Sequence, residues 1–271
     1  MPELPEVETI ARGLDKRAAG DVIESVWIGS RTQPLKSRPD EIAKMLEGAR
    51  LKAVRRVGKH IAADLENQDG SPRGQWIIHL GMTGRVLVCP PEIEVPKHTH
   101  LIARLRSRSE LRFVDPRMFG KLQVVPANTF AAPGKEPLDI GFELFSDLFR
   151  KRKTPIKSAL LNQKLLSGVG NIYADEALFR AGVRPRRRAA SLTRNELHKL
   201  YEAIPVVLKE AIAAGGSSVS DYVDASGEEG FFQLQHRVYG REDEPCLVCK
   251  TPIKRIVISG RSSHYCPKCQ R

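Results

Sequence analysis

The four cysteines near the end of the chain constrain its fold more than any other feature. They form two pairs with two residues inside each pair, and sixteen residues separate Cys249 from Cys266. Each pair can place two sulfur atoms on one metal ion, and the segment between the pairs is long enough for a hairpin that brings them together. Two disulfides are the alternative, but an intracellular chain would not keep them. Four thiolates leave no open position for water, so the sequence predicts one structural Zn²⁺ held by Cys246, Cys249, Cys266 and Cys269.

The chain is strongly basic. Its 271 residues include 44 Lys and Arg against 32 Asp and Glu, a formal net charge of +12. The basic residues gather in three segments, 104–117, 150–153 and 184–188. Three clusters favour a nucleic acid over a plain solvated surface, and no basic amphipathic helix points to a membrane. No run of eighteen apolar residues and no signal peptide is recognisable, so we expect a soluble, intracellular protein without a membrane partner.

The two halves of the chain differ in the spacing of their apolar residues. Apolar residues recur with helical spacing from residue 7 to residue 14. From residue 22 to about 125 the apolar runs are short and alternating, which is typical of an antiparallel β-sandwich. The second half has helical periodicity, and Thr193 with Glu196 predicts a capping box at the start of a helix that ends at Gly215. The expected fold class is α+β.

The opening segment MPELPE could supply a nucleophile. Removal of Met1 would expose the secondary amine of Pro2, and an α-amino group with a pKa of about 7.7–8.0 is neutral at pH 7 far more often than a lysine. Such an amine can attack a sugar C1′ to form a cationic iminium, which is an electron sink for elimination. Glu3 is adjacent and can transfer protons, and Glu6 lies one helical turn further on. Acidic residues are also common in a first helical turn, so a segment like this one, taken alone, is more often a helix start than a catalytic site.

Six motifs in order resemble those of one known family. They are MPELPEVET at the terminus, RVGKH at 56–60, HLGMTG at 79–84, DPRMFG at 115–120, NQKLLSGVGNIYADEALFRAG at 162–182, and the cysteine pairs enclosing GRSSHYC. Together they resemble the formamidopyrimidine-DNA glycosylases over residues 2–270. The resemblance implies a bifunctional repair enzyme that removes oxidised purines, such as 8-oxoguanine and formamidopyrimidines, from duplex DNA and then cleaves the abasic site by β,δ-elimination.

The resemblance also assigns roles to individual residues. Pro2 would be the Schiff-base nucleophile and Glu3 the general acid and base. Lys59 would donate a proton in β-elimination, and Arg261 would do so in δ-elimination while binding a phosphate. The residues implied to contact DNA are His98, Arg117, Arg152 and Asn171, with Met82, Arg117 and Phe119 filling the gap left by the everted base. The residues implied to contact the lesion are Glu6 and, in a loop at 217–227 that closes over it, Ser217, Ser218 and Tyr222.

The domain organisation follows from the same resemblance. We expect an N-terminal helix and catalytic β-sandwich domain at 1–133, a linker at 134–150, a helix-two-turn-helix DNA-binding domain at 151–237 and a zinc-finger hairpin at 238–271. The protein is expected to be a monomer in a bacterial-type cytoplasm, associated with the nucleoid. Its partner would be double-stranded DNA that contains oxidised bases or abasic sites.

The chain departs from the family pattern at a few positions. Met118 stands where the family usually has arginine, and Gly260 stands where glutamine is common. Two other interpretations remain open. An endonuclease VIII-type glycosylase would share the fold and the amine but prefer oxidised pyrimidines. A non-catalytic zinc-ribbon DNA-binding protein would explain the charge and the cysteines, but not the MPELPE terminus or Lys59.

Overall fold

The computed structural model describes residues 1–218 and 223–271, which form two compact units. One unit contains Met1–Ala131 and Ala214–Phe231, and the other contains Ala132–Ala213 and Phe232–Arg271. Residues 214–231 therefore group with the N-terminal part, although we expected them in the helical domain. The zinc-finger segment groups with the helices rather than forming a unit of its own. The four-part division stays a prediction.

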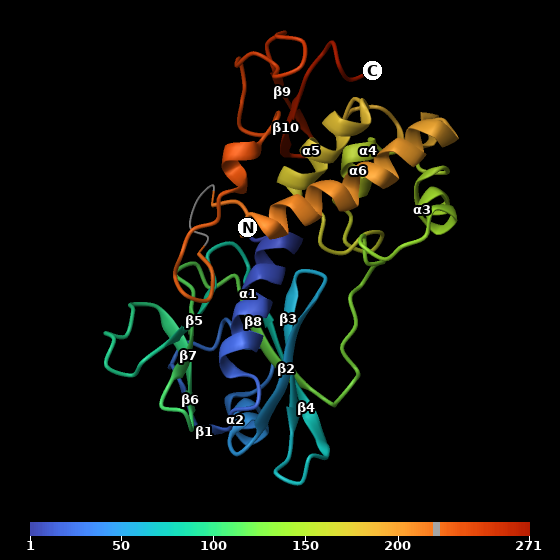
Figure 1. Ribbon diagram of the computed structural model, residues 1–271. Helices are drawn as coiled ribbons and strands as arrows, with labels where there is room; N and C mark the ends of the chain where they lie inside the picture. Colours follow the sequence, from blue (N-terminus) through green and yellow to red (C-terminus); the bar gives the residue numbers. More distant parts are fainter. Residues whose placement is uncertain (219–222) are drawn as a thin grey trace. The chain divides into compact units, whose positions relative to one another are not determined.

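The first unit is the predicted antiparallel β-sandwich with helices (Figure 1). One sheet has the strand order β2-β3-β4-β8, made of Arg50–Val57, His60–Glu66, Pro72–His79 and Lys121–Val125. The other has the order β1-β6-β7-β5, made of Ile23–Ile28, Thr99–Leu105, Glu110–Val114 and Arg85–Cys89. All neighbouring strands of both sheets are antiparallel. The unit also contains the helices α1 (Leu4–Ala18) and α2 (Pro39–Leu46).

Helix α1 contributes its apolar stripe to the core that both sheets share. Ile10 and Leu14 belong to the same buried cluster as Ile61 of one sheet and Phe113 of the other. Each large apolar side chain buried in this way stabilises the fold by about 1.5–3 kcal/mol. Pro5 fits the first helical turn because a proline there gives up no hydrogen bond of the helix. The start of the chain is therefore held firmly against the sandwich.

The second unit contains four α-helices among its described residues and ends in a hairpin (Figure 1). The helices are α3 (Phe142–Phe149), α4 (Ile156–Leu160), α5 (Asn171–Ala181) and α6 (Arg194–Ala213); two short 3₁₀ helices span Ala189–Ser191 and Phe232–Gln235. The hairpin pairs β9 (Lys254–Ile258) with β10 (Arg261–Tyr265). The α+β class with a helical domain and a C-terminal hairpin is confirmed.

The expected linker at 134–150 is not an open connection, because it contains α3. Phe145 and Phe149 of this helix are buried, and their rings pack 4.7 Å apart. The Pro and Gly residues before the helix obscured the apolar periodicity of FELFSDLF. No helix within residues 1–218 and 223–271 has both the length and the continuous apolar character needed to cross a bilayer.

The predicted capping box opens α6. The Thr193 N–H donates to Glu196 Oε2 at 2.8 Å, and the Glu196 N–H donates to Thr193 Oγ1 at 3.2 Å. Arg187 forms an ion pair with the same carboxylate. The Arg187 hydrogen bond and the Thr193 N–H together lower the pKa of Glu196 to about 2, against the opposing effect of burial.

This depressed pKa predicts an acid-sensitive contribution to stability. The folded pKa lies below the unfolded one, so the contribution is complete above about pH 4.5 and decreases as the pH falls towards 2. We expect Glu196→Gln to lower the unfolding free energy by about 1 kcal/mol at pH 7, because the site is partly screened by solvent. Denaturant titrations of both proteins at pH 7 and pH 3 measure the difference. A difference of equal size at the two pH values would contradict this account.

Candidate active site

The start of α1 holds the first predicted catalytic residues. Pro2 and Glu3 are buried, whereas Met1 is 49% exposed. Glu6 Oε2 accepts the backbone N–H of Glu3 at 2.8 Å, and Glu6 Oε1 accepts the backbone N–H of Ser217 at 2.9 Å. The Glu6 carboxylate thus connects the beginning of the helix to the beginning of the 217–227 loop. These two hydrogen bonds position the backbone of Glu3 and of Ser217.

Lys59 lies in the turn between β2 and β3 and is only 8% exposed. The neighbouring Arg56 donates from Nε to Glu8 Oε2 at 2.8 Å and from Nη1 to the Gly58 carbonyl at 3.2 Å. Glu8 belongs to α1, so Arg56 ties the turn that carries Lys59 to the helix that begins beside Pro2. No local sequence pattern indicates this hydrogen bond, because its partners are 48 residues apart.

Two histidines lie beside Lys59 on paired strands. His60 and His79 are opposite each other in β3 and β4, with ring centroids 4.8 Å apart. Burial is the largest cause that lowers the pKa of His79 to about 4, and electrostatic repulsion by protonated His60 and by Lys59 acts in the same direction. His79 Nδ1 accepts the N–H of Gly81 at 3.2 Å, so the proton of the neutral ring lies on Nε2. Burial also lowers the pKa of His60, so neutral pH favours the uncharged form of both rings beside Lys59.

The residues predicted as a wedge lie on two loops whose backbones touch. Met82 is 41% exposed and Phe119 is 51% exposed, which excludes the alternative that they are core residues. The Arg117 guanidinium lies 4.9 Å from the centre of the Phe119 ring. Gly81 has φ +64°, and a Cβ there would lie 2.5 Å from the backbone nitrogen of Gly120. Only glycine allows this contact between the loops.

Asp115, which the sequence analysis did not single out, organises both loops. Its side chain is fully buried. Oδ1 accepts the Thr83 hydroxyl at 2.6 Å, and Oδ2 accepts the Gly120 N–H at 2.7 Å. The Arg117 N–H points to Oδ1 at 3.3 Å, and His100 Nε2 bonds the Asp115 carbonyl at 2.9 Å. The available signal was an acidic residue at the first position of the DPRMFG motif.

In the second unit, Asn171 and Arg261 lie on neighbouring elements. Asn171 is the first residue of α5, and its Nδ2 donates to Ser262 Oγ at 3.3 Å. Arg261 precedes Ser262 on β10 and is exposed. The turn before it has φ +49° at Ser259 and +75° at Gly260, as a two-residue turn with both central residues left-handed requires. Gly260 therefore suits this hairpin.

A buried ion pair fixes the hairpin against the helices. Lys157 Nζ lies 2.7 Å from Asp175 Oδ1, and both side chains are fully buried. Asp175 Oδ2 also accepts the N–H of His264 at 2.8 Å, and Lys157 donates to the Ser262 carbonyl at 2.6 Å. These bonds join α4 and α5 to β10, the strand that begins with Arg261. No local pattern indicates that these distant residues meet.

The remaining predicted residues lie as follows. His98 has φ +70°, and its carbonyl accepts the Asp115 N–H at 3.0 Å. Arg152 is exposed after α3 and donates from Nε to the Leu148 carbonyl at 2.8 Å. Ser218 Oγ accepts the Gly230 N–H at 2.9 Å. Tyr222 lies outside the described residues.

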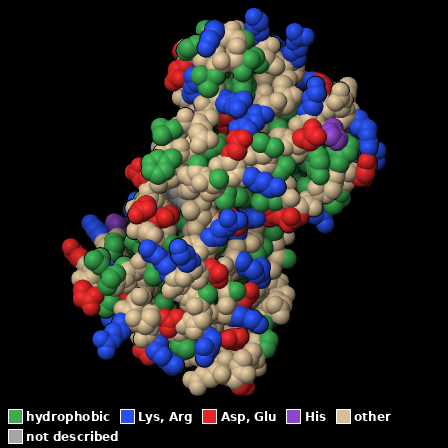
Figure 2. All heavy atoms as spheres, in the orientation of Figure 1, with side chains coloured by type: hydrophobic (Ala, Val, Ile, Leu, Met, Phe, Trp, Pro, Cys, Tyr) green, Lys and Arg blue, Asp and Glu red, His purple; other side chains and the backbone are tan. Residues whose placement is uncertain are grey.

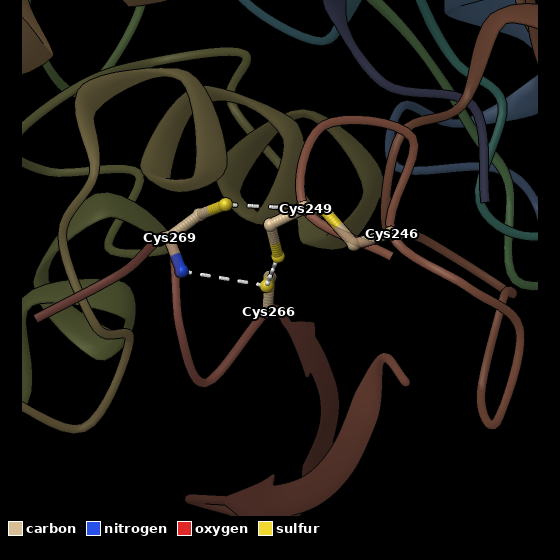
Figure 3. Close-up of side chains that lie close together, drawn as sticks. All are labelled: Cys246, Cys249, Cys266 and Cys269. Carbon is tan, nitrogen blue, oxygen red and sulfur yellow. Dashed lines mark hydrogen bonds between the residues drawn. The ribbon is translucent and has the colours of Figure 1, made fainter. Parts of the chain in front are cut away.

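The four predicted zinc ligands converge (Figure 3). Their sulfur atoms all lie within 4.8 Å of one another; the Cys246–Cys269 separation is 3.9 Å and the Cys249–Cys266 separation is 3.4 Å. Ligands about 2.3 Å from a tetrahedral zinc are about 3.8 Å apart, so this arrangement fits the ion. Cys246 and Cys266 are buried in a small cluster with Ile253. The protein carries a structural zinc here, as the sequence predicted.

Removal of the metal should disorder the end of the chain. The cluster around the cysteines is small, and the metal supplies much of the folding free energy of such segments. We expect a chelator to abolish the amide hydrogen-exchange protection of residues 254–265, and readdition of Zn²⁺ to restore it. Amides of the β-sandwich serve as the internal control and should keep their protection. A hairpin that stays protected without zinc would contradict the structural role.

Loss of Asp175 should leave an uncompensated buried ammonium group. We expect Asp175→Ala to reduce the unfolding free energy of the second unit by about 3–5 kcal/mol. The double variant Lys157→Met/Asp175→Leu removes both charges and should cost less than the single variant. Denaturant unfolding of the three proteins gives the comparison. A double variant less stable than Asp175→Ala would show that the two side chains do not act as a pair.

Family models match nearly the whole chain. Residues 1–122 match the formamidopyrimidine-DNA glycosylase N-terminal domain, 133–223 match the H2TH domain of the same enzyme, and 243–271 match a zinc finger found in FPG and IleRS. A formamidopyrimidine-DNA glycosylase from Solibacter usitatus is 46% identical over 273 residues, with 100% of both chains covered. One from Listeria monocytogenes is 40% identical over 279 residues, again with 100% of both covered.

Solved structures agree with these matches. The MutM (Fpg) protein of Thermus thermophilus is 39% identical and superimposes with a TM-score of 0.87, covering 99% of this chain and 98% of that one. A Lactococcus lactis Fpg in complex with DNA containing an abasic site is 31% identical with a TM-score of 0.90, and 99% of each chain is covered. The two units and the cysteine cluster are thus those of one known architecture. The chain belongs to the formamidopyrimidine-DNA glycosylase family.

Proposed function

We propose that this protein removes oxidised purines from double-stranded DNA and then cleaves the strand at the resulting abasic site. The observation that carries the proposal is the buried start of α1, where Pro2 and Glu3 are adjacent and the Arg56–Glu8 bond ties the Lys59 turn to the same helix. Relatives of the same architecture have been solved with DNA containing an abasic site and with DNA containing Fapy-dG.

The proposed reaction begins with the amine of Pro2 after Met1 has been removed. The nitrogen forms a bond to C1′ of the damaged nucleotide, the bond from C1′ to the base breaks, and the base leaves with a proton. Glu3 transfers the protons that open the sugar ring, and the product is a cationic iminium. The buried carboxylate of Glu3 favours this positive charge because little water screens it.

The iminium then drives strand cleavage. Loss of a proton from C2′ expels the 3′ phosphate in β-elimination, and we assign the accompanying proton donation to Lys59. The second, δ-elimination expels the 5′ phosphate, and we assign that donation to Arg261, which also binds a phosphate beside Asn171.

DNA binding and base eversion depend on the basic surface and the two exposed loops. Figure 2 shows Lys and Arg side chains at many separate places on the visible face, interspersed with Asp and Glu. The net charge of +12 suits a polyanion. Eversion of a base costs a few kcal/mol, and the exposed side chains of Met82 and Phe119 offset this cost by filling the vacated stack. Glu6, Ser217, Ser218 and Tyr222 are assigned to the lesion side. The protein would act as a monomer in the cytoplasm, on nucleoid DNA.

Borohydride trapping tests the proposed nucleophile. Incubation with duplex DNA containing 8-oxoguanine, followed by reduction, should give a covalent adduct with the wild type and a much weaker one with Pro2→Gly, whose α-amine is primary and lacks the proline ring. Pro39→Gly is the matched control, because Pro39 begins α2 in the same unit and should leave the adduct unchanged. Mass spectrometry of the trapped protein should show that Met1 is absent. An adduct on protein that retains Met1 would refute the mechanism.

The same assay separates the alternative functions. An endonuclease VIII-type enzyme would give its stronger adduct with DNA containing thymine glycol instead of 8-oxoguanine. A non-catalytic zinc-ribbon protein would bind both duplexes and give no adduct with either. We expect the 8-oxoguanine duplex to give the stronger adduct.

A further inference from the structure

A basic pocket lies where three neighbouring strands of the β1-β6-β7-β5 sheet begin or end. The end of β1, the beginning of β6 and the end of β7 lie side by side there, because these three strands are antiparallel neighbours. The pocket has a volume of about 240 Å³. The side chains around it that carry chemistry are Trp27, Arg31, Lys97, His98, Thr99 and His100.

The chemistry of this pocket suits an anion with a planar group attached. None of its lining residues, all within the described part of the chain, is acidic. Arg31 and Lys97 are exposed, and Trp27 is 51% exposed on β1. The indole lies against Gly29, where a Cβ would be 3.3 Å from Cη2 of the Trp27 ring. Cations beside an open aromatic face are the two elements with which proteins hold a nucleotide, one for the phosphate and one for stacking.

The pocket is continuous with the loop that carries the predicted wedge. Arg31 Nη1 lies 3.9 Å from Met118 Sδ, and Met118 stands between Arg117 and Phe119. On the other side, the His98 carbonyl accepts the N–H of Asp115, the residue that shapes the same loop. Arg31 therefore lies next to the loop that would enter the DNA. All of these contacts lie within the first unit.

We propose that this pocket binds a nucleotide of the DNA beyond the everted base. Arg31 and Lys97 contact a backbone phosphate, and Trp27 stacks against the sugar or base of that nucleotide. The assignment rests on the proposed function, because duplex DNA is the ligand, and it adds Trp27, Arg31 and Lys97 to the DNA-contacting residues. Met118 stands where the family usually has arginine, so the Arg31 guanidinium lies beside a position that has lost its charge in this chain.

Binding to duplexes of two lengths tests the proposal. One duplex with a non-cleavable abasic-site analogue is long, and the other is trimmed close to the lesion. We expect Trp27→Ala to weaken binding of the long duplex about tenfold and to leave the trimmed duplex unchanged. Trp27→Phe should restore most of the affinity because it keeps an aromatic face. Arg31→Ala should weaken binding of the long duplex and reduce the slope of log affinity against log salt by about one unit.

The control separates a local contact from general charge. Arg106→Ala removes the same charge from the far end of β6, where Arg106 pairs with Glu24 at 3.6 Å, and should have a smaller effect. Three results would overturn the proposal: wild-type affinity of Trp27→Ala for the long duplex, equal losses on both duplexes, or equal effects of Arg31→Ala and Arg106→Ala. Because binding needs no cleavage, a wild type that binds but forms no borohydride adduct would refute the proposed function alone.

Discussion

The buried carboxylate of Asp115 is the interaction on which the candidate DNA-contacting surface of the first unit depends. A buried charge is tolerated only when hydrogen bonds replace its lost hydration, and Asp115 obtains them from Thr83, Arg117 and Gly120. These donors belong to two loops that are far apart in the sequence. The hydrogen bonds of the Asp115 carboxylate therefore fix the two loops against each other. The same bonds keep Met82 and Phe119 exposed. An apolar side chain at position 115 could fill the space, but it could not join the loops.

In the second unit, a buried ion pair compensates a buried carboxylate in a similar way. Lys157 and Asp175 are fully buried, and their remaining bonds go to the backbone of β10 at Ser262 and His264. The position of Arg261 is therefore set by groups on two helices as well as by the hairpin itself. In both units a surface side chain with a proposed function depends on a buried charged group. Such groups are more sensitive to substitution than the exposed residues they support.

Patterns of nearby residues could be predicted from the sequence, whereas long-range contacts could not. The helix at the N-terminus, the antiparallel strands, the Thr193–Glu196 box and the zinc ligands each depend on local spacing, and the structure contains all of them. Helix α3 was missed because Pro and Gly residues hid its short apolar pattern. The return of residues 214–231 to the first unit depends on contacts such as the Glu6–Ser217 bond, which no local pattern indicates. The Arg56–Glu8 and Lys157–Asp175 pairs were missed for the same reason.

The zinc site links the proposed roles of Arg261 to the redox state of the cell. Arg261 lies on a hairpin whose small core contains Cys246 and Cys266, while Pro2, Glu3 and Lys59 belong to the other unit. Oxidised purines arise under conditions that also convert thiolates to sulfenic acids and disulfides. Severe oxidation would then deprive the protein of Arg261 and leave the amine of Pro2 intact. Because Arg261 is also assigned to phosphate binding, its loss would weaken DNA binding as well as the proton donation proposed for δ-elimination.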